Sequence, residues 1–140
     1  MAMLSKIDLS IEAYEKRRFP DTHHRSDSRT ATRFKPHGVV VVLAPFNLPC
    51  HLSNAHIVPA LLTGNTVVFK PSERTPLVAQ ELCQLWEFAV LHPGTFNLVQ
   101  GDRKAGELLT DHPDIDGLFF TGGYKAGLEI HQKYADHPGK

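Results

Sequence analysis

Cysteine is scarce in this sequence, which has only Cys50 and Cys83 among its 140 residues. Two thiols so far apart cannot build a disulfide framework or a thiolate metal site, so we expect both to be reduced, packed side chains. The nine histidines are scattered, and His51 and His56 stand five positions apart, which does not give the shared helix face that a histidine metal pair needs. The sequence therefore predicts no metal site.

An excess of charge of either sign is also missing. Lys and Arg total 15, Asp and Glu total 15, and the isoelectric point is about 7.1. Nucleic-acid and anionic-membrane partners call for a basic surface, so we expect neither. No apolar run is long enough to span a bilayer, and the amino-terminal MAMLSKIDLS lacks the long apolar core of a secretory signal. These absences predict a cytoplasmic protein.

Short apolar runs alternate with helical patterns from residue 38 onward. The run VVVVLAP has no polar alternation, which is typical of a strand covered on both faces. Further strands are expected at Thr66–Phe69, Thr95–Val99 and Gly117–Thr121, with helices at residues 51–62, 76–91 and 104–110 and a last helix that follows the loop GGYKAG and runs to about Ala135. Gly64 suits a left-handed helix stop, and Pro59 indicates a bend or a late helix start. The pattern predicts an α/β fold with a doubly wound parallel sheet.

The first 37 residues carry a different pattern. Leu4, Ile7, Ile11 and Tyr14 recur at helical spacing and predict an amphipathic helix that ends before Pro20. The polar stretch from residue 21 to 29 reads as a loop or linker, and residues 29–35 as an extended arm. We therefore divide the chain into an amino-terminal helix, linker and arm at 1–37 and a sheet domain at 38–140.

Three loops fall at the carboxyl ends of predicted strands, namely residues 44–49, 70–73 and 122–127. Ligands of open α/β sheets bind at this edge. Lys70 and Glu73 suit a ribose, because a carboxylate accepts bonds from vicinal hydroxyls and an ammonium donates to the sugar or a phosphate. Taken alone, each loop also has a plain reading, as solvated charges or as a glycine-rich turn, since G-G-x-x-x-G is not the G-x-G-x-x-G fingerprint. Together they predict a nucleotide site.

Four segments in this order resemble the aldehyde dehydrogenase superfamily: APFNLP, GNTVVFKPSE, PGTFNLVQG and FTGG. The resemblance covers nearly the whole chain from Lys35 onward. Finer details, HGVVVVLAPFNLPCHLSNAHIVPALLTGNTVVFKPSE and HPDIDGLFFTG, look most like the succinylglutamate-semialdehyde dehydrogenases of arginine breakdown. The resemblance implies part of a Rossmann-like NAD-binding domain.

The resemblance also assigns roles by position. Ala44, Pro45 and Phe46 resemble the wall beside the nicotinamide, and Asn47 matches the asparagine whose amide donates to the thiohemiacetal oxyanion. A fixed donor aimed at developing charge acts mainly in the transition state. The alternative for Asn47 is a turn residue that bonds the backbone between two prolines.

The remaining assignments concern the rest of the cofactor. Lys70 and Glu73 match the family's ribose-contacting pair, and the Glu73 carboxylate would repel a 2′-phosphate, which favours NAD over NADP. The pyrophosphate loop matches six consecutive positions: Gly122, Gly123, Tyr124, Lys125, Ala126 and Gly127. A serine usually follows the first glycine, so Gly123 implies the loss of one hydroxyl contact. Lys125 has two readings, a phosphate partner or a solvated lysine.

The resemblance places the general-base glutamate and the nucleophilic cysteine beyond residue 140, in parts of the family fold that this sequence does not include. We therefore expect the chain alone not to oxidise aldehydes, which only the complete enzyme would bind. The alternatives are a non-catalytic nucleotide-binding subunit completed by a second chain, or a decayed remnant of an enzyme of other specificity. The resemblance implies that the helix and arm of residues 1–37 pack on missing parts or on a neighbouring subunit, so we also expect exposed apolar patches and self-association unless a second chain covers them.

Overall fold

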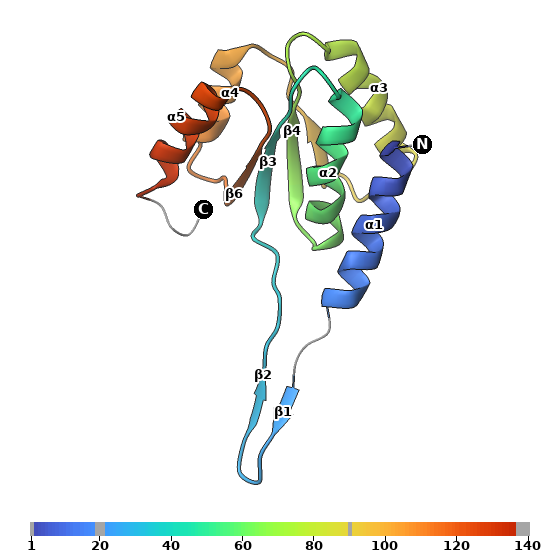
Figure 1. Cartoon of the computed structure of the whole chain (residues 1–140), viewed down its shortest axis with the longest axis vertical. Helices are drawn as coiled ribbons and strands as arrows, with labels where there is room; N and C mark the ends of the chain where they lie inside the picture. Colours follow the sequence, from blue (N-terminus) through green and yellow to red (C-terminus); the bar gives the residue numbers. More distant parts are fainter. Residues whose placement is uncertain (1, 19–21, 90, 137–140) are drawn as a thin grey trace.

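The computed structural model describes residues 2–18, 22–89 and 91–136. Its centre is a four-stranded parallel sheet in the order β5-β4-β3-β6, formed by Val39–Leu43 (β3), Thr66–Lys70 (β4), Phe96–Leu98 (β5) and Gly117–Phe120 (β6). The register pairs Val39 with Thr66 and Leu43 with Lys70. The predicted parallel α/β fold is confirmed, and the strands end at one edge of the sheet (Figure 1).

Helices cover both faces of this sheet, as the apolar strands predicted. Pro49–Leu62 (α2) and Pro76–Glu87 (α3) lie on one face, whereas Arg103–Asp111 (α4) and Tyr124–Tyr134 (α5) lie on the other (Figure 1). The helix α2 begins at Pro49 and runs through Pro59, so the alternative of a late start is wrong. Proline at the first helical position fits because its missing N–H has no intrahelical partner there.

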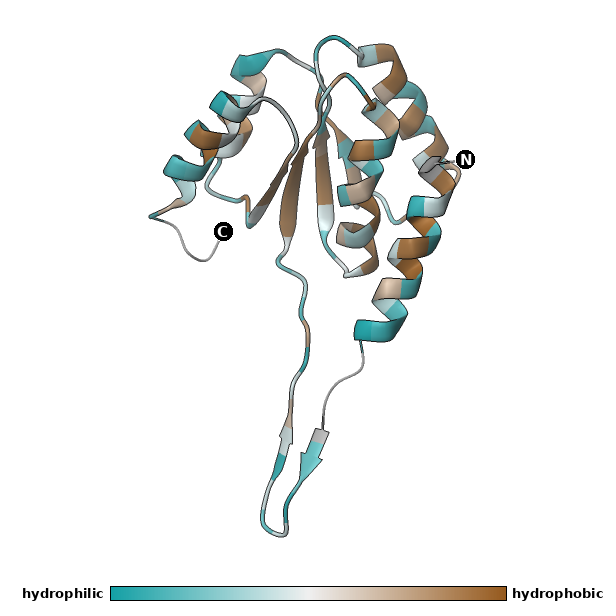
Figure 2. Ribbon diagram, viewed as in Figure 1, coloured by the Kyte–Doolittle hydropathy of each residue, from teal (hydrophilic) through white to brown (hydrophobic). Residues whose placement is uncertain are grey.

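The four valines of β3 explain this double covering. Val40 and Val42 face α2 and α3 and pack with Ile57, Val67 and Phe69 in the larger core. The alternate residues Val41 and Leu43 face the other way, toward the smaller core under α4 and α5. Val41 and Val42 are fully buried, and Figure 2 shows the strands as the hydrophobic centre of the molecule.

A glycine and an asparagine connect α2 to β4. Gly64 adopts a φ of 85°, the left-handed conformation that the sequence predicted, and its N–H donates to the carbonyl of Leu61. The next residue, Asn65, is buried, and its Oδ1 accepts from the N–H groups of His37 at 2.7 Å and Gly38 at 3.1 Å. One amide thus ties the arm that enters β3 to the turn that enters β4.

The amino-terminal segment differs from its prediction in two ways. The helix α1 (Ala2–Arg17) packs on α2 through residues 6, 7, 10, 13 and 14, whereas Leu4 and Ile11 of the predicted stripe are exposed. The loop expected at 21–29 holds for residues 25–28 but is wrong at Thr22–His24 (β1), which pairs antiparallel with Arg29–Ala31 (β2). The two short strands, THH and RTA, carry no apolar alternation, so the sequence offered no pattern from which to predict this hairpin. It extends away from the sheet (Figure 1).

Candidate functional site

A cleft of about 350 Å³ opens at the carboxyl ends of β3, β4 and β6. All three predicted loops contribute to it. Of the predicted site residues, eight line this cleft: Ala44, Pro45, Phe46, Lys70, Glu73, Gly122, Gly123 and Ala126. Parallel strands end at a common edge, so turns distant in the sequence meet there. We call this cleft the crevice.

The other four predicted residues are not among those that line the crevice. Tyr124 and Gly127 line a shallower neighbouring hollow together with Phe120, Leu128 and His131, and Tyr124 is largely exposed. Asn47 and Lys125 are also exposed and line neither hollow. The structure therefore brings most of the predicted cofactor residues together and leaves Asn47 just outside, one residue past Phe46.

Lys70 is the most constrained charged residue of the crevice. It is only 6% exposed, and its Nζ donates to the carbonyl of Pro71 at 2.8 Å. Burial lowers the pKa of Lys70 below its ordinary value, while the nearby carboxylates of Glu73 and Asp102 oppose that shift. A buried ammonium held beside carboxylates retains donors for a ligand that enters the crevice.

Glu73 is the partner of Lys70 but is much more open to solvent. Its side chain is 55% exposed, and its Oε2 lies 4.0 Å from Lys70 Nζ. At that distance the pair adds little to stability. The carboxylate oxygens therefore keep their capacity to accept hydrogen bonds. The next residue, Arg74, places its guanidinium 4.8 Å from the centre of the Phe46 ring, so a cation–π contact connects this loop to the loop after β3.

The glycine turn before α5 does not have a left-handed backbone conformation. Neither Gly122 nor Gly123 has a positive φ. A Cβ on Gly122 would lie 2.6 Å from Phe120 Cζ, so glycine is needed there to make room for the ring. Gly123 is the N-cap of α5 with no side-chain cap, and the first helical bond runs from Gly127 N to Gly123 O. The preceding N–H groups of this first turn have no helical acceptor, which suits an anion.

Sequence reasoning missed the helix residues of the crevice. Arg103, Glu107 and Glu129 line it from α4 and α5, together with apolar and hydroxyl groups at Gly106, Thr110 and Ile130. The position of α4 could have been predicted in part. This helix follows β5, which neighbours β4, and so begins at the same edge of the sheet. What the sequence did not show was that α5 leans toward α4 and faces it across the crevice.

Both cysteines behave as packed thiols, as predicted. Cys83 is buried in α3 and Cys50 is partly buried in α2. Burial raises the pKa of both thiols, which lowers the thiolate fraction that a nucleophile needs. In residues 2–18, 22–89 and 91–136 there is no group of three metal-ligating side chains that could hold an ion. Across the same ranges, no helix combines the length and apolarity needed to cross a membrane.

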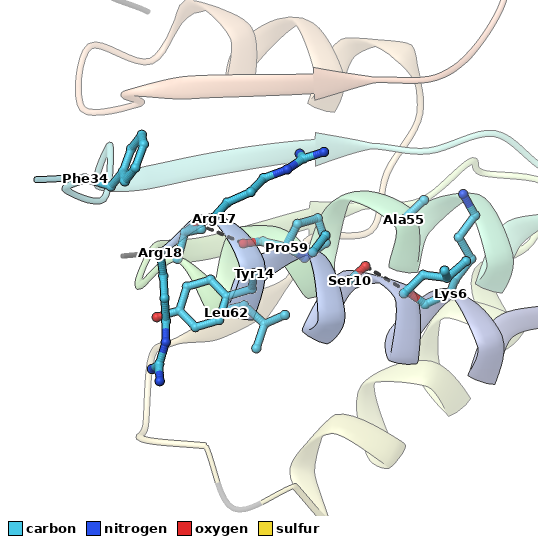
Figure 3. Close-up of a pocket in the computed structure, with 12 residues that line it drawn as sticks. Lys6, Ser10, Tyr14, Arg17, Arg18, Phe34, Ala55, Pro59 and Leu62 are labelled. Carbon is cyan, nitrogen blue, oxygen red and sulfur yellow. Dashed lines mark hydrogen bonds between the residues drawn. The ribbon is translucent and has the colours of Figure 1, made fainter. Parts of the chain in front are cut away.

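A second hollow of about 480 Å³ lies between α1 and α2 (Figure 3). Its apolar lining includes Tyr14, Phe34, Pro59 and Leu62, and Arg17 also lines it. Phe34 is 75% exposed, so the predicted exposed apolar surface is confirmed. Self-association through such surface stays a prediction, which light scattering would contradict by showing a clean, stable monomer.

Comparison with known proteins decides what this arrangement is. The sequence model that describes the aldehyde dehydrogenase family matches residues 2–140 of this chain. The chain belongs to the aldehyde dehydrogenase family. The sheet and its helices correspond to part of the Rossmann-like NAD-binding domain of these enzymes.

Three solved structures of aldehyde dehydrogenases and related proteins illustrate the match. A Mycobacterium tuberculosis aldehyde dehydrogenase complexed with NAD+ is 32% identical, has a TM-score of 0.89, and matches 97% of this chain and 28% of its own. HpcC from Thermus thermophilus is 35% identical with a TM-score of 0.83, over 97% of this chain and 27% of its own. The betaine aldehyde dehydrogenase of Staphylococcus aureus, in complex with NAD+, is 28% identical with a TM-score of 0.85, over 96% and 28%. The chain thus spans little more than a quarter of these proteins.

Proposed function

We propose that the crevice binds NAD as the cofactor site of an aldehyde dehydrogenase. The observation that carries this proposal is the convergence of three separate turns on one cleft at the carboxyl edge of a parallel sheet. The residues present fit the cofactor, because an ammonium, a carboxylate and unpaired helix N–H groups are the partners that a dinucleotide needs. When bound, NAD supplies the hydride acceptor for aldehyde oxidation.

In this proposal each turn has its own task. Glu73 accepts hydrogen bonds from the ribose hydroxyls, and Lys70 donates to the same sugar. The first turn of α5, from Gly122 onward, receives the pyrophosphate on its N–H groups. Ala44, Pro45 and Phe46 form the wall beside the nicotinamide.

Asn47 is the residue that we propose to act on the reacting aldehyde. Its position after Phe46, at the edge of the crevice, supports the role of an amide donor to the oxyanion in the whole protein.

A calorimetric titration with NAD tests the cofactor proposal. Glu73→Gln removes the charge of an exposed side chain, so the fold should persist while NAD binding weakens by about tenfold, the effect of losing a charge-assisted hydrogen bond. Glu81→Gln, an exposed carboxylate on α3, is the matched control and should leave affinity unchanged. No heat at millimolar NAD with folded wild-type protein would refute the proposal and favour a decayed remnant.

We propose further that the whole protein oxidises N-succinyl-L-glutamate 5-semialdehyde to N-succinylglutamate in arginine catabolism. The support is the sequence of the segments that contain α2, β4 and β6, which resemble that subfamily most. Comparing kcat/KM for this aldehyde and for betaine aldehyde in the whole protein tests it. Equal efficiency for the two aldehydes would refute the specificity.

A further inference from the structure

Arg103 holds two carboxylates across the crevice. Its Nε donates to Glu107 Oε1 at 2.7 Å within α4, and its Nη2 donates to Glu129 Oε2 of α5 at 2.8 Å. All three side chains line the crevice that also contains Lys70 and Glu73. The second bond therefore joins α4 to α5 at the crevice itself, and not at a remote surface.

The first turn of α4 lies close to Lys70. A Cβ on Gly106 would stand 3.8 Å from Lys70 Cδ, and the carboxylate of Asp102 acts on the charge of Lys70. Arg103 follows Asp102 directly and belongs to this turn. The turn from which Arg103 extends thus lies beside Lys70, which the proposed function assigns to the ribose together with Glu73.

The charges in the crevice favour a ribose without a phosphate. Lys70 and Arg103 are the cations among the residues that line it, and Glu73, Glu107 and Glu129 are the carboxylates. An arginine fork is the side chain best suited to a phosphate monoester. Here two of its donor groups are committed to carboxylates, so a 2′-phosphate would meet an occupied fork and an excess of negative charge.

We propose that Glu107 and Glu129 are specificity-determining residues that hold Arg103 away from a 2′-phosphate and so make the crevice select NAD over NADP. This inference rests on the proposed function of the crevice as a cofactor site. Glu73 acts by direct repulsion, whereas Glu107 and Glu129 act by withholding a cation. Removing both charges frees a guanidinium that lines the same crevice as the ribose pair and can then bind the added phosphate.

The test compares two probes that differ by one phosphate, 5′-AMP and adenosine 2′,5′-bisphosphate, by calorimetry at low salt on the full chain. In Glu107→Gln/Glu129→Gln we expect the affinity ratio to move about tenfold toward the bisphosphate, as a freed charge-assisted contact would bring. Glu81→Gln is the matched control and should leave the ratio where the wild type has it.

A third variant identifies the cation. Adding Arg103→Gln to the double variant should cancel the gain, and circular dichroism confirms that each variant is folded. If the double variant does not fold, Glu129→Gln alone releases one donor group and should give a smaller shift in the same direction. An unchanged ratio, or a gain that survives Arg103→Gln, overturns the inference while leaving the cofactor site intact. Failure of folded wild type to bind 5′-AMP overturns both proposals.

Discussion

Substitution by alanine should destabilise the protein at Gly122 but not at Gly123, the adjacent glycine at the start of α5. In Gly122→Ala the new Cβ would lie 2.6 Å from Phe120 Cζ and 3.1 Å from Cε2, so the ring must move. Such overpacking commonly costs about 1–3 kcal/mol. Phe120 packs on the smaller core and also lines the crevice, so its displacement should weaken NAD binding as well as stability.

Gly123→Ala provides the matched control. A Cβ there meets no heavy atom within 4 Å, and the φ of −68° is open to any residue. We expect its free energy of unfolding to stay within about 0.5 kcal/mol of wild type. Gly123→Ser, which places a hydroxyl at the N-cap and beside the proposed pyrophosphate site, should tighten NAD binding by a factor of about 2 to 12, which corresponds to one hydrogen bond.

Urea unfolding followed by circular dichroism measures the stability of these variants, and calorimetry measures NAD affinity. The reasoning is refuted if Gly122→Ala unfolds at the same urea concentration as Gly123→Ala. It is also refuted if Gly123→Ala weakens NAD binding more than Gly122→Ala does, because the steric argument would then point to the wrong glycine.

Two further predictions concern stability. Asn65→Ala removes two acceptor and two donor bonds of a buried amide, so urea unfolding should show a loss of about 2–4 kcal/mol, against a much smaller loss for the exposed Asn97→Ala; equal losses would contradict the anchoring role. His56 has a pKa held below its ordinary value of 6.5 by burial first and by the Lys6 charge second. Unfolded protein therefore takes up a proton near pH 6.5 that the folded His56 resists, so stability should fall as pH drops from 6.5 toward the lowered pKa and stay level above 6.5. In His56→Gln the wild-type loss on acidification should shrink, and a pH profile identical to wild type would refute the assignment.

Much of the site could be predicted from the sequence because its loops directly follow strands. An unbroken valine run predicted β3, and a breaker after Lys70 predicted the end of β4, so both loops could be assigned to one sheet edge. Asn47 and Lys125 show where this reasoning stops. Being next to a site residue in the sequence does not fix the direction of a side chain, which depends on turn geometry.

The sequence by itself determined the layers of this protein: which apolar runs are strands, that helices cover both faces of β3, and which turns stand at the ligand edge. These features follow from local chemistry, because apolar periodicity and breaker residues act over a few positions. Only the tertiary structure decided that Arg103 bridges α4 and α5, that Phe120 needs a glycine beside it, and that residues 22–31 form a hairpin. Those contacts depend on how helices lean and on backbone pairing between polar strands, which no short-range pattern encodes.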